Sequence, residues 1–349
     1  MKFHRPHCFG ALALVFLCGA FLVRPAVARE PRTVAVTHTK DSPDSEARME
    51  GVRIQVLLDR AFFRPGKIDG LGGEFTQKAA DRFLATQGQP PGTRIDTSGI
   101  ANPYRDYTVS ETDMKWIGPQ ASTPQEQEKL KAMKYVDAWE LVAERFHCDL
   151  DFLHELNPHV PESPGAGTVF RVPDVQEFIV DDVLALEKKR RDDKKAAQAA
   201  ASASPSEAAT PTPAPVYRMM LSRKERLIEL YENDKMVGCF PCTPGSPEIP
   251  VPEGTWKVVA NVLMPTFRWD KSVLETGVKS DTAYELPSGP NNPVGIVWMA
   301  INRPSVGIHG TPSPDQIGRN QSHGCIRTAN WDAWILAQMV NKGTVLEVQ

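Results

Sequence analysis

The chain has little that would crosslink it, hold it in a membrane or attract a highly charged partner. It contains 349 residues but only six cysteines, and two of them, Cys8 and Cys18, fall in an N-terminal segment that we expect to be removed. The remaining thiols are too few for a disulfide scaffold in a chain of this length. After residue 28 no apolar run is long enough to cross a bilayer. The formal net charge is −3, which gives no reason to expect a nucleic-acid partner.

The first 28 residues predict a secretory signal. After a basic start, the chain is almost entirely apolar from Cys8 to Val23, and Ala26-Val27-Ala28 supplies the small residues that a signal peptidase recognises. An uncleaved membrane anchor is the alternative, but the apolar run is short for a span. We therefore expect residues 1–28 to be cleaved and the protein to be exported across the inner membrane, to the periplasm or the cell wall.

Thirty prolines suggest a segmented chain, and the first compact unit is expected at residues 46–110. Apolar residues at helical spacing around Val52 and Val56 predict a helix. A turn-rich segment follows from Arg64 to Gly70, and Thr76 is placed to cap a second helix. This helix, Pro-Gly-x-Ile-Asp-Gly turn and second helix resemble the small peptidoglycan-binding domain of many wall enzymes, over about residues 48–88. A generic helical hairpin is the alternative.

A second small unit is expected at residues 134–175. Apolar residues around Trp139 predict one helix, and those from Leu150 predict another, which Asn157-Pro158 would end. A glycine-containing turn then leads into a strand that ends at Val172-Pro173. This order resembles a LysM-type glycan-binding module, although no clear first strand precedes the helices. Residues 89–130 support no functional prediction.

Residues 181–215 are expected to form a linker. The mixed charge run from Glu187 to Lys195 favours a solvated helical tail. From Ala196 to Pro215 the chain is almost only Ala, Ser, Thr, Pro, Gln and Glu, which have nothing to bury. We therefore expect that stretch to be an extended, mobile tether.

From residue 216 the pattern changes to strands, so the expected fold class is a multidomain protein with small helical and α+β N-terminal modules and a mostly β domain at 216–349. A β-hairpin is predicted around Asn233-Asp234-Lys235, and Val294 to Ile301 and Val306 to His309 predict two further strands. Asn330 is predicted to cap a C-terminal helix that presents Trp331 and Trp334 on one face.

Two of the remaining cysteines are separated by two residues, as in many redox motifs. Cys239-Phe240-Pro241-Cys242 lies in a strand-like run rather than at the start of a helix. A low thiol pKa in such motifs depends on that helix start. We therefore expect either a disulfide or two buried thiols here, and not a redox centre.

The residues suited to catalysis gather in two stretches, Ile308-His309-Gly310-Thr311 and Ser322-His323-Gly324-Cys325-Ile326-Arg327. A cysteine attacks as its thiolate, and a free thiol has a pKa of about 8.5. Cys325 therefore needs a base, and both His309 and His323 are candidates. Backbone N–H groups around Gly324 could stabilise an oxyanion, worth about 3 kcal/mol per donor. Arg327 offers a guanidinium fork to a substrate carboxylate.

A zinc site is the alternative chemistry for these residues. His309, His323 and Cys325 would supply three ligands, enough for an open catalytic site. No carboxylate base is evident on a nearby helix. We therefore expect no metal and no cofactor.

The two stretches, in this order and spacing, look like the signature of the L,D-transpeptidase (YkuD-type) catalytic domain. The resemblance covers about residues 216–349 and includes Pro252-x-Gly254-Thr255-Trp256. It implies a β-rich sandwich with Cys325 as nucleophile and His309 as proton donor and acceptor, with the Gly310 carbonyl orienting the imidazole. It places Ser322, His323 and Gly324 around the oxyanion and the substrate, and Arg327 beside the cysteine.

The resemblance implies a function in the bacterial wall. Cys325 would form a thioester with a peptidoglycan stem tetrapeptide, release the terminal D-alanine and pass the acyl group to an amine. The partners would be stem peptides and glycan, with a wall-anchored protein as another conceivable acceptor, and carbapenem β-lactams would acylate the cysteine. An L,D-carboxypeptidase, a hydrolase that detaches a wall-linked protein, and a non-catalytic wall-binding protein are the alternatives.

Overall fold

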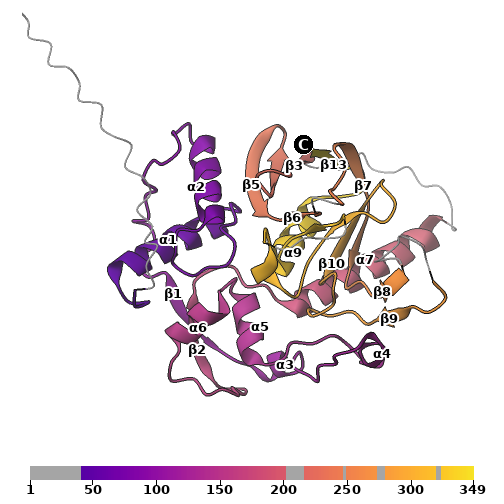
Figure 1. Ribbon diagram of the computed structural model, residues 1–349, viewed down its shortest axis with the longest axis horizontal. Coiled ribbons are helices and arrows are strands. Elements are labelled where there is room, and N and C mark those ends of the chain that lie inside the picture. Colours follow the sequence, from indigo (N-terminus) through magenta and orange to yellow (C-terminus); the bar gives the residue numbers. More distant parts are fainter. Residues whose placement is uncertain (1–40, 202–215, 247–248, 273–279, 320–323) are drawn as a thin grey trace, which may run out of the picture.

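The computed structural model describes residues 41–201, 216–246, 249–272, 280–319 and 324–349. The helical N-terminal half and the β-rich C-terminal half lie side by side, and one long helix, α7, projects from the body (Figure 1). The predicted signal segment, Ser322 and His323 lie outside the described residues. Across the described ranges, no helix combines the length and apolar character needed to span a membrane.

The N-terminal hairpin consists of α1 (Glu46–Arg60) and α2 (Glu74–Thr86), as predicted. The Ser45 hydroxyl caps α1 by accepting from the Arg48 N–H. The prediction that Thr76 caps α2 is wrong, because the helix begins at Glu74, with Gly73 as its cap. Thr76 instead lies inside the helix, where its hydroxyl accepts a hydrogen bond from buried Gln55.

Gln55 holds the turn between these helices. Its Oε1 accepts from the N–H groups of Asp69 and Gly70, at 3.0 and 2.7 Å. Its Nε2 donates to the Asp69 carboxylate and to the Leu71 carbonyl, at 2.9 and 3.0 Å. Gly70 has a φ of +72°, a conformation that favours glycine. One buried amide therefore satisfies three backbone groups of the turn, the N–H groups of Asp69 and Gly70 and the carbonyl of Leu71.

The next unit is a two-stranded sheet with helices between its strands. β1 (Tyr104–Thr108) pairs antiparallel with β2 (Val169–Pro173) along all five residues. Between them come α3 (Glu111–Met114), α4 (Pro124–Gln127), α5 (Ala138–Arg145) and α6 (Leu150–Leu156).

The expected boundaries of this unit need correction. Ending one unit at residue 110 and starting the next at 134 separates two strands that pair. The first strand is hard to recognise because only Tyr104 in it is buried, so it has no apolar alternation. We refer below to residues 104–175 as the ββ-unit.

The segment expected to be a linker begins as a helix. α7 spans Val180–Ala201, so the helical tail predicted for the charge run is confirmed. The expectation of extended chain from Ala196 is wrong for residues 196–201, where alanines continue the helix. Residues 202–215 lie outside the described residues.

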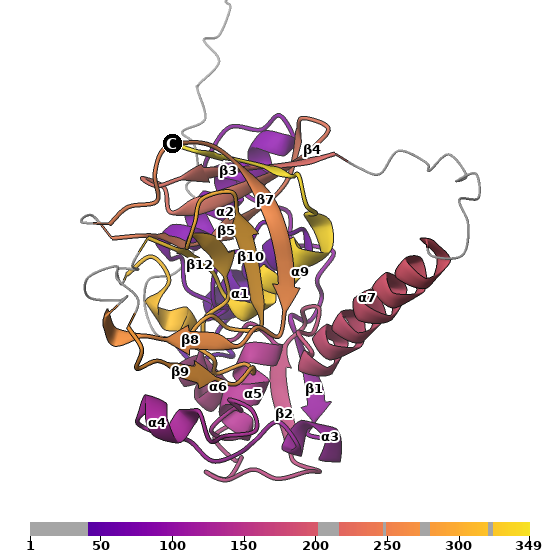
Figure 2. The ribbon, with the colours of Figure 1, turned by 90° about the vertical axis from the view of Figure 1, so that its right-hand side faces the viewer.

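The C-terminal half is built on a nine-stranded sheet in the order β5-β4-β3-β13-β7-β10-β11-β12-β6. Two pairs are parallel, β3 with β13 and β11 with β12, and the other pairs are antiparallel. Figure 2 shows the long strand β7 running through this half. The predicted mostly β domain with a C-terminal helix is therefore confirmed. The strands are β3 (Tyr217–Ser222), β4 (Leu227–Glu232), β5 (Lys235–Pro241), β6 (Thr243–Pro244), β7 (Gly254–Leu263), β10 (Val297–Ile301), β11 (Gly307–His309), β12 (Ile326–Arg327) and β13 (Val345–Val348), with a separate pair, β8 (Phe267–Trp269) and β9 (Tyr284–Leu286).

The C-terminal helix α9 (Asn330–Met339) is buried on all sides over residues 330–337. Its cap is Ala329, so the prediction that Asn330 caps it is wrong; the Asn330 side chain bonds to other segments instead. Trp331 stacks on His147 of the ββ-unit, with ring centroids 5.1 Å apart. α9 therefore lies between the sheet and the N-terminal units, which explains why more than one face of it is buried.

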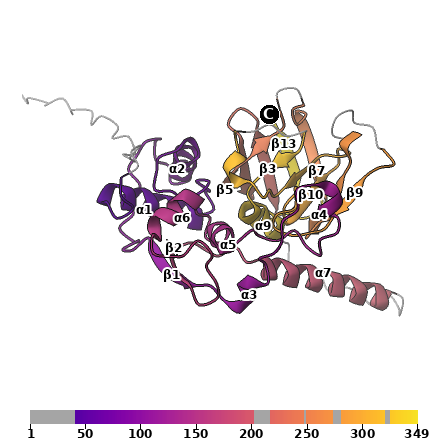
Figure 3. The same ribbon diagram turned by 60° about the horizontal axis from the view of Figure 1, so that its bottom comes forward.

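The N-terminal units are docked on the β domain and share its apolar core (Figure 3). The Arg64 N–H donates to the Cys239 carbonyl at 2.8 Å, and the Cys239 N–H donates to the Phe62 carbonyl at 3.0 Å. The hairpin thus covers the outer edge of β5. A Cβ added at Gly238 would lie 2.7 Å from the Phe62 carbonyl oxygen. The picture of binding units held away from the β domain by a mobile tether is therefore wrong for the described residues.

Candidate active site

The register of two short strands brings the candidate cysteine and histidine together. β11 and β12 are parallel, with Ile308 opposite Ile326 and His309 opposite Arg327. Both isoleucines are fully buried and point into the core. Because side chains alternate along a strand, His309, Arg327 and Cys325, which directly precedes β12, lie on the other face. His309 and Cys325 therefore lie on the same face of two neighbouring strands.

Trp298 is a residue of this face that the sequence reasoning missed. It lies opposite His309 on the neighbouring strand β10, and the two rings stack with centroids 5.4 Å apart. Gly307 makes room for the indole, since a Cβ there would lie 2.9 Å from the Trp298 ring. Alternation along β10, whose residues Val297 and Met299 are buried, is the signal that could have placed Trp298 beside the histidine.

His309 is held as a neutral base. It is 3% exposed, and its Nδ1 lies 2.6 Å from the Gly310 carbonyl oxygen. A carbonyl can only accept, so Nδ1 carries the proton and Nε2 keeps its lone pair. Burial lowers the pKa of His309 to about 4, and the nearby Arg327 charge acts in the same direction. The Gly310 carbonyl oxygen is thus the hydrogen-bond partner of the imidazole.

Cys325 is a partly buried thiol beside the same strand. Its Sγ donates to the Ser305 carbonyl at 3.5 Å. Burial raises the pKa of Cys325, while a hydrogen bond from the Gly307 backbone and the Arg327 charge oppose that rise. With the imidazole pKa lowered as well, thiol and imidazole are both neutral at rest.

The residues next to the cysteine are described only in part. Gly324 has a φ of +87° and packs against Ile249, since a Cβ there would lie 3.3 Å from the isoleucine Cγ2. Ser322 and His323 lie outside the described residues. Their implied places around the oxyanion, and the zinc alternative that uses His323, therefore stay predictions.

A cavity of about 250 Å³ adjoins Arg327 on this side of the domain. Arg327 is the charged residue in its wall, as expected for a group that holds a carboxylate. Neither Cys325 nor His309 lines it. Its other walls come from β6, the loop before β10 and the loop after β11, through Thr243, Pro293, Thr311, Pro312, Ser313, Gln316 and Ile317.

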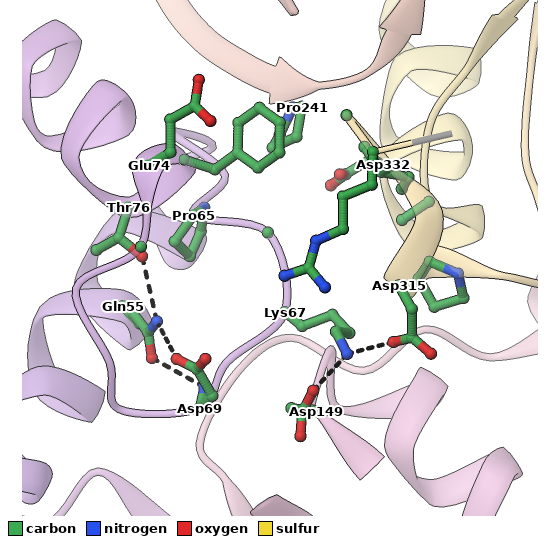
Figure 4. Close-up of a pocket in the computed structure, with 18 of the residues that line it drawn as sticks. Gln55, Pro65, Lys67, Asp69, Glu74, Thr76, Asp149, Pro241, Asp315 and Asp332 are labelled. Carbon is green, nitrogen blue, oxygen red and sulfur yellow. Dashed lines mark hydrogen bonds and ion pairs between the residues drawn. The ribbon is translucent and has the colours of Figure 1, made fainter. Parts of the chain in front are cut away.

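A second cavity, of about 260 Å³, lies between the hairpin, the start of α6 and the β domain (Figure 4). Neither Cys325 nor His309 lines it. Lys67 in its wall is ion-paired with both Asp149 and Asp315, which join three units. Gln55 in its wall is bonded as described above. The charged side chains in the wall of this cavity thus link the three units. The cavity is separate from the residues suited to catalysis.

Among the described residues, three further cysteines are free thiols. Cys148, Cys239 and Cys242 are all buried, and burial raises the pKa of each. Of the two alternatives left open for Cys239 and Cys242, the structure has buried thiols. Raised pKa values in such surroundings leave them unreactive.

Comparison with known proteins finds similarity over the β domain. The family model of the L,D-transpeptidase catalytic domain, YkuD, matches residues 216–348. The putative L,D-transpeptidase YkuD of Bacillus licheniformis is 29% identical over 132 residues, which cover 38% of this chain and 65% of that protein. The probable L,D-transpeptidase YbiS of Escherichia coli K12 is 42% identical over 59 residues, which cover 17% of this chain and 19% of that protein.

Two solved structures are similar over part of the chain. One is the L,D-transpeptidase LdtMt1 in complex with imipenem, at 21% identity and a TM-score of 0.32, covering 39% of this chain and 59% of that one. The other is L,D-transpeptidase 3 from Mycobacterium tuberculosis with a faropenem-derived adduct, at 22% identity and a TM-score of 0.32, covering 39% and 60%. The match to the family model begins only at residue 216, so α1 to α7 precede it. Residues 216–348 of this chain are therefore the part that is similar to the L,D-transpeptidase (YkuD) catalytic domain.

Proposed function

We propose that the protein is a peptidoglycan L,D-transpeptidase that works through a cysteinyl thioester. The observation that carries this is the register of β11 and β12, which puts His309 and Cys325 on one face with the imidazole Nε2 unprotonated. Nucleophile and base in this relation are the requirement for covalent acyl transfer. The substrate class follows from the family of residues 216–348.

The proposed reaction has two halves. In the first, Cys325 Sγ attacks the carbonyl carbon of the third stem residue while its proton passes to His309 Nε2. The C–N bond to the terminal D-alanine then breaks, and the departing amine takes that proton. In the second half an acceptor amine attacks the thioester carbonyl and gives its proton to His309. The C–S bond then breaks, and the departing thiolate takes that proton back from the imidazole.

Charge that develops on the carbonyl oxygen needs donors. The Gly324–Cys325 backbone is the candidate, because the positive φ of Gly324 turns the chain sharply just before the nucleophile. The predicted contributions of Ser322 and His323 belong to the same loop. Arg327, in the wall of the adjoining cavity, would hold a stem carboxylate.

We propose that the N-terminal units bind the wall polymer, the hairpin as a peptidoglycan-binding-like domain and the ββ-unit as a LysM-like module. The strand pair of β1 and β2 around α5 and α6 supplies the first strand that the sequence pattern lacked. Export through the predicted signal at residues 1–28 would deliver the protein to the periplasm or the cell wall.

Inhibition follows from the same mechanism. LdtMt1 has been solved with imipenem, and the M. tuberculosis enzyme with a faropenem-derived adduct. If Cys325 is the nucleophile, a carbapenem should acylate it by opening the β-lactam ring. A shift in intact mass that is absent in Cys325→Ala would locate the adduct.

The acceptor separates this proposal from its alternatives. Purified full-length protein and Cys325→Ala are incubated with disaccharide tetrapeptide, and the products are weighed by mass spectrometry. A crosslinked dimer that has lost one D-alanine supports transpeptidation, whereas a tripeptide alone supports an L,D-carboxypeptidase. Products that do not depend on Cys325 would refute both enzymatic readings and leave a wall-binding protein.

A further inference from the structure

A side chain of the ββ-unit reaches the back of the active site through Asn330. Asn330 is the first residue of α9 and is fully buried. Its Oδ1 accepts from the Ile296 N–H at 3.2 Å. Its Nδ2 donates to the Pro290 carbonyl at 3.1 Å and to Glu144 Oε1 at 2.8 Å. One amide thus joins the segment before β10 to α5.

The Asn330 amide also packs directly against the backbone that orients the catalytic histidine. A Cβ added at Gly310 would lie 2.1 Å from Asn330 Oδ1, and one at Gly295 would lie 2.0 Å from it. The backbone of Gly310 therefore lies on the amide with no space between them. Since the Gly310 carbonyl accepts from His309 Nδ1, any displacement of the amide moves the acceptor that sets the tautomer.

Glu144 determines where that amide sits. It is 7% exposed on α5, and its two oxygens accept from different donors, Tyr135 Oη and Asn330 Nδ2. Both of its oxygens are therefore engaged. Removing its carboxyl group would leave the Asn330 Nδ2 with one acceptor fewer in a site that water does not reach.

Neighbouring contacts hold α5 in register with this part of the β domain. The Met133 N–H donates to the Ser288 carbonyl at 2.9 Å, and the Asn291 N–H donates to the Met133 carbonyl at 3.0 Å. Asn291 Nδ2 also donates to Glu140 Oε1 at 3.1 Å. The hydrogen bond of Glu144 to Asn330 is therefore one of several contacts between this part of the ββ-unit and the β domain.

We propose that Glu144 is a positioning residue of the active site, which acts through Asn330 to fix the Gly310 carbonyl and thereby the orientation and tautomer of His309. Glu144 lies outside residues 216–348, so a residue of the ββ-unit helps to hold the geometry of the site. The consequence for catalysis rests on the proposed function, whereas the tautomer does not. Misplacement of a reacting group by about 1 Å can cost about 100-fold in rate.

Three variants of the full-length chain test this. Glu144→Ala removes the carboxyl group, and Glu144→Gln keeps an acceptor for Asn330 and a donor for the Tyr135 oxygen. Val142→Ala is the matched control, because Val142 is a fully buried residue of the same helix with no side-chain hydrogen bond. The readouts are the ¹⁵N shifts of the His309 ring, and kcat and KM for release of D-alanine.

We expect Glu144→Ala to lower kcat about tenfold or more at nearly constant KM, and Glu144→Gln to stay within about twofold of wild type. The His309 shifts should move away from the Nδ1–H tautomer in the Ala variant alone. Equal losses in Glu144→Ala and Val142→Ala would overturn the proposal, as would an unchanged tautomer in Glu144→Ala.

Two further outcomes are decisive. If Glu144→Ala does not fold, Glu144→Asp replaces it, because the shorter side chain keeps the carboxyl group but draws it away from Asn330. An unchanged tautomer and rate in that variant would refute the proposal. If wild type releases no D-alanine but the tautomer still depends on Glu144, the proposed function fails while the positioning role stands.

Discussion

Two residues of the first turn of α9 reach into the N-terminal half, and they do so with opposite chemistry. Asp332 faces Arg64 of the hairpin, whose Nε lies 3.3 Å from Asp332 Oδ1. Asn330 faces Glu144 of the ββ-unit through a hydrogen bond between an amide and a carboxyl group. We call the first the charged junction and the second the amide junction.

The charged junction consists of a guanidinium between two buried carboxyl groups. Arg64 Nη1 lies 2.5 Å from Asp59 Oδ1, and all three side chains are at most 1% exposed. Burial raises the pKa of Asp332 to about 8. Burial would also raise that of Asp59, but Arg64 and His147 hold it at about 2. One full ion pair and one largely protonated acid therefore share the cation at neutral pH.

The amide junction contains no full charge at neutral pH. Burial raises the pKa of Glu144 to about 8, although hydrogen bonds from Tyr135 and Asn330 act against the rise. The two junctions therefore differ in charge, and we expect them to have different effects. The charged junction links the hairpin to the β domain, and the amide junction links the ββ-unit to the backbone beside His309.

Breaking the charged junction should have the largest effect on stability. Arg64→Ala leaves the Asp59 carboxylate buried without its cation, which typically costs about 3–5 kcal/mol. Urea unfolding followed by tryptophan fluorescence measures it. Arg60→Ala is the control, because its ion pair with Asp174 is at the surface and should contribute less than about 1 kcal/mol. Similar losses in both variants would contradict this view of the junction.

The amide junction should make stability depend on pH. Because the folded-state pKa of Glu144 lies above its ordinary value of 4.5, the folded protein binds a proton that the unfolded chain has lost. Its contribution is therefore complete below about pH 4.5 and is lost as pH rises towards 8, by roughly 3 kcal/mol at pH 7.

Glu144→Gln isolates this contribution because it removes the titrating group, keeps an acceptor for Asn330 and donates to the Tyr135 oxygen in place of accepting from it. The difference in unfolding free energy between variant and wild type, measured in urea at pH 5 and pH 8, should grow with pH in favour of the variant. A difference that stays constant across this range would show that Glu144 is ionised in the fold.

The sequence predicted the helices on both sides of the two junctions, but neither junction itself. Periodicity predicted α1, α2, α5 and α6, and the spacing of His309, Gly310 and Cys325 predicted which residues meet at β11 and β12. Periodicity is a local signal, whereas the pairing of His309 with Cys325 was implied by the family resemblance and stays a prediction. Ser322 and His323 stay untested predictions because they lie outside the described residues.

Contacts between the units leave no local pattern in the sequence. Glu144 and Asn330 are 186 residues apart, and nothing in either local pattern marks a glutamate of α5 as a partner of α9. Asn330 in particular has the residue type of a helix cap, and tertiary packing overrides that preference. The pairing of β1 with β2 was missed for the same reason, since its first strand is recognised only through its partner.

A smaller effect should follow from Tyr135→Phe, which removes one donor from Glu144 and leaves the bond to Asn330. The loss should be about 1 kcal/mol, the usual contribution of one hydrogen bond. The His309 ¹⁵N shifts should not change, because Asn330 keeps its acceptor. A changed tautomer in this variant would mean that the whole Tyr135–Glu144 pair, and not the Glu144–Asn330 bond alone, positions the site.

The smallest change is expected from Asp332→Asn at the charged junction. With the pKa of Asp332 near 8, the wild-type carboxyl group is mostly protonated at pH 7, so the amide replaces a neutral group of the same shape. The unfolding free energy at pH 4, close to the ordinary pKa of 3.8, should change by less than about 1 kcal/mol, because the carboxyl group then loses little proton on unfolding. At pH 7 the variant should be the more stable protein, because the wild type must take up a proton on folding, and the His309 tautomer should stay as it is. A loss comparable to that of Arg64→Ala would mean that Asp332 is ionised and that Arg64 neutralises two carboxylates. In that case the charged junction, and not only Asp59, would depend on a second full ion pair.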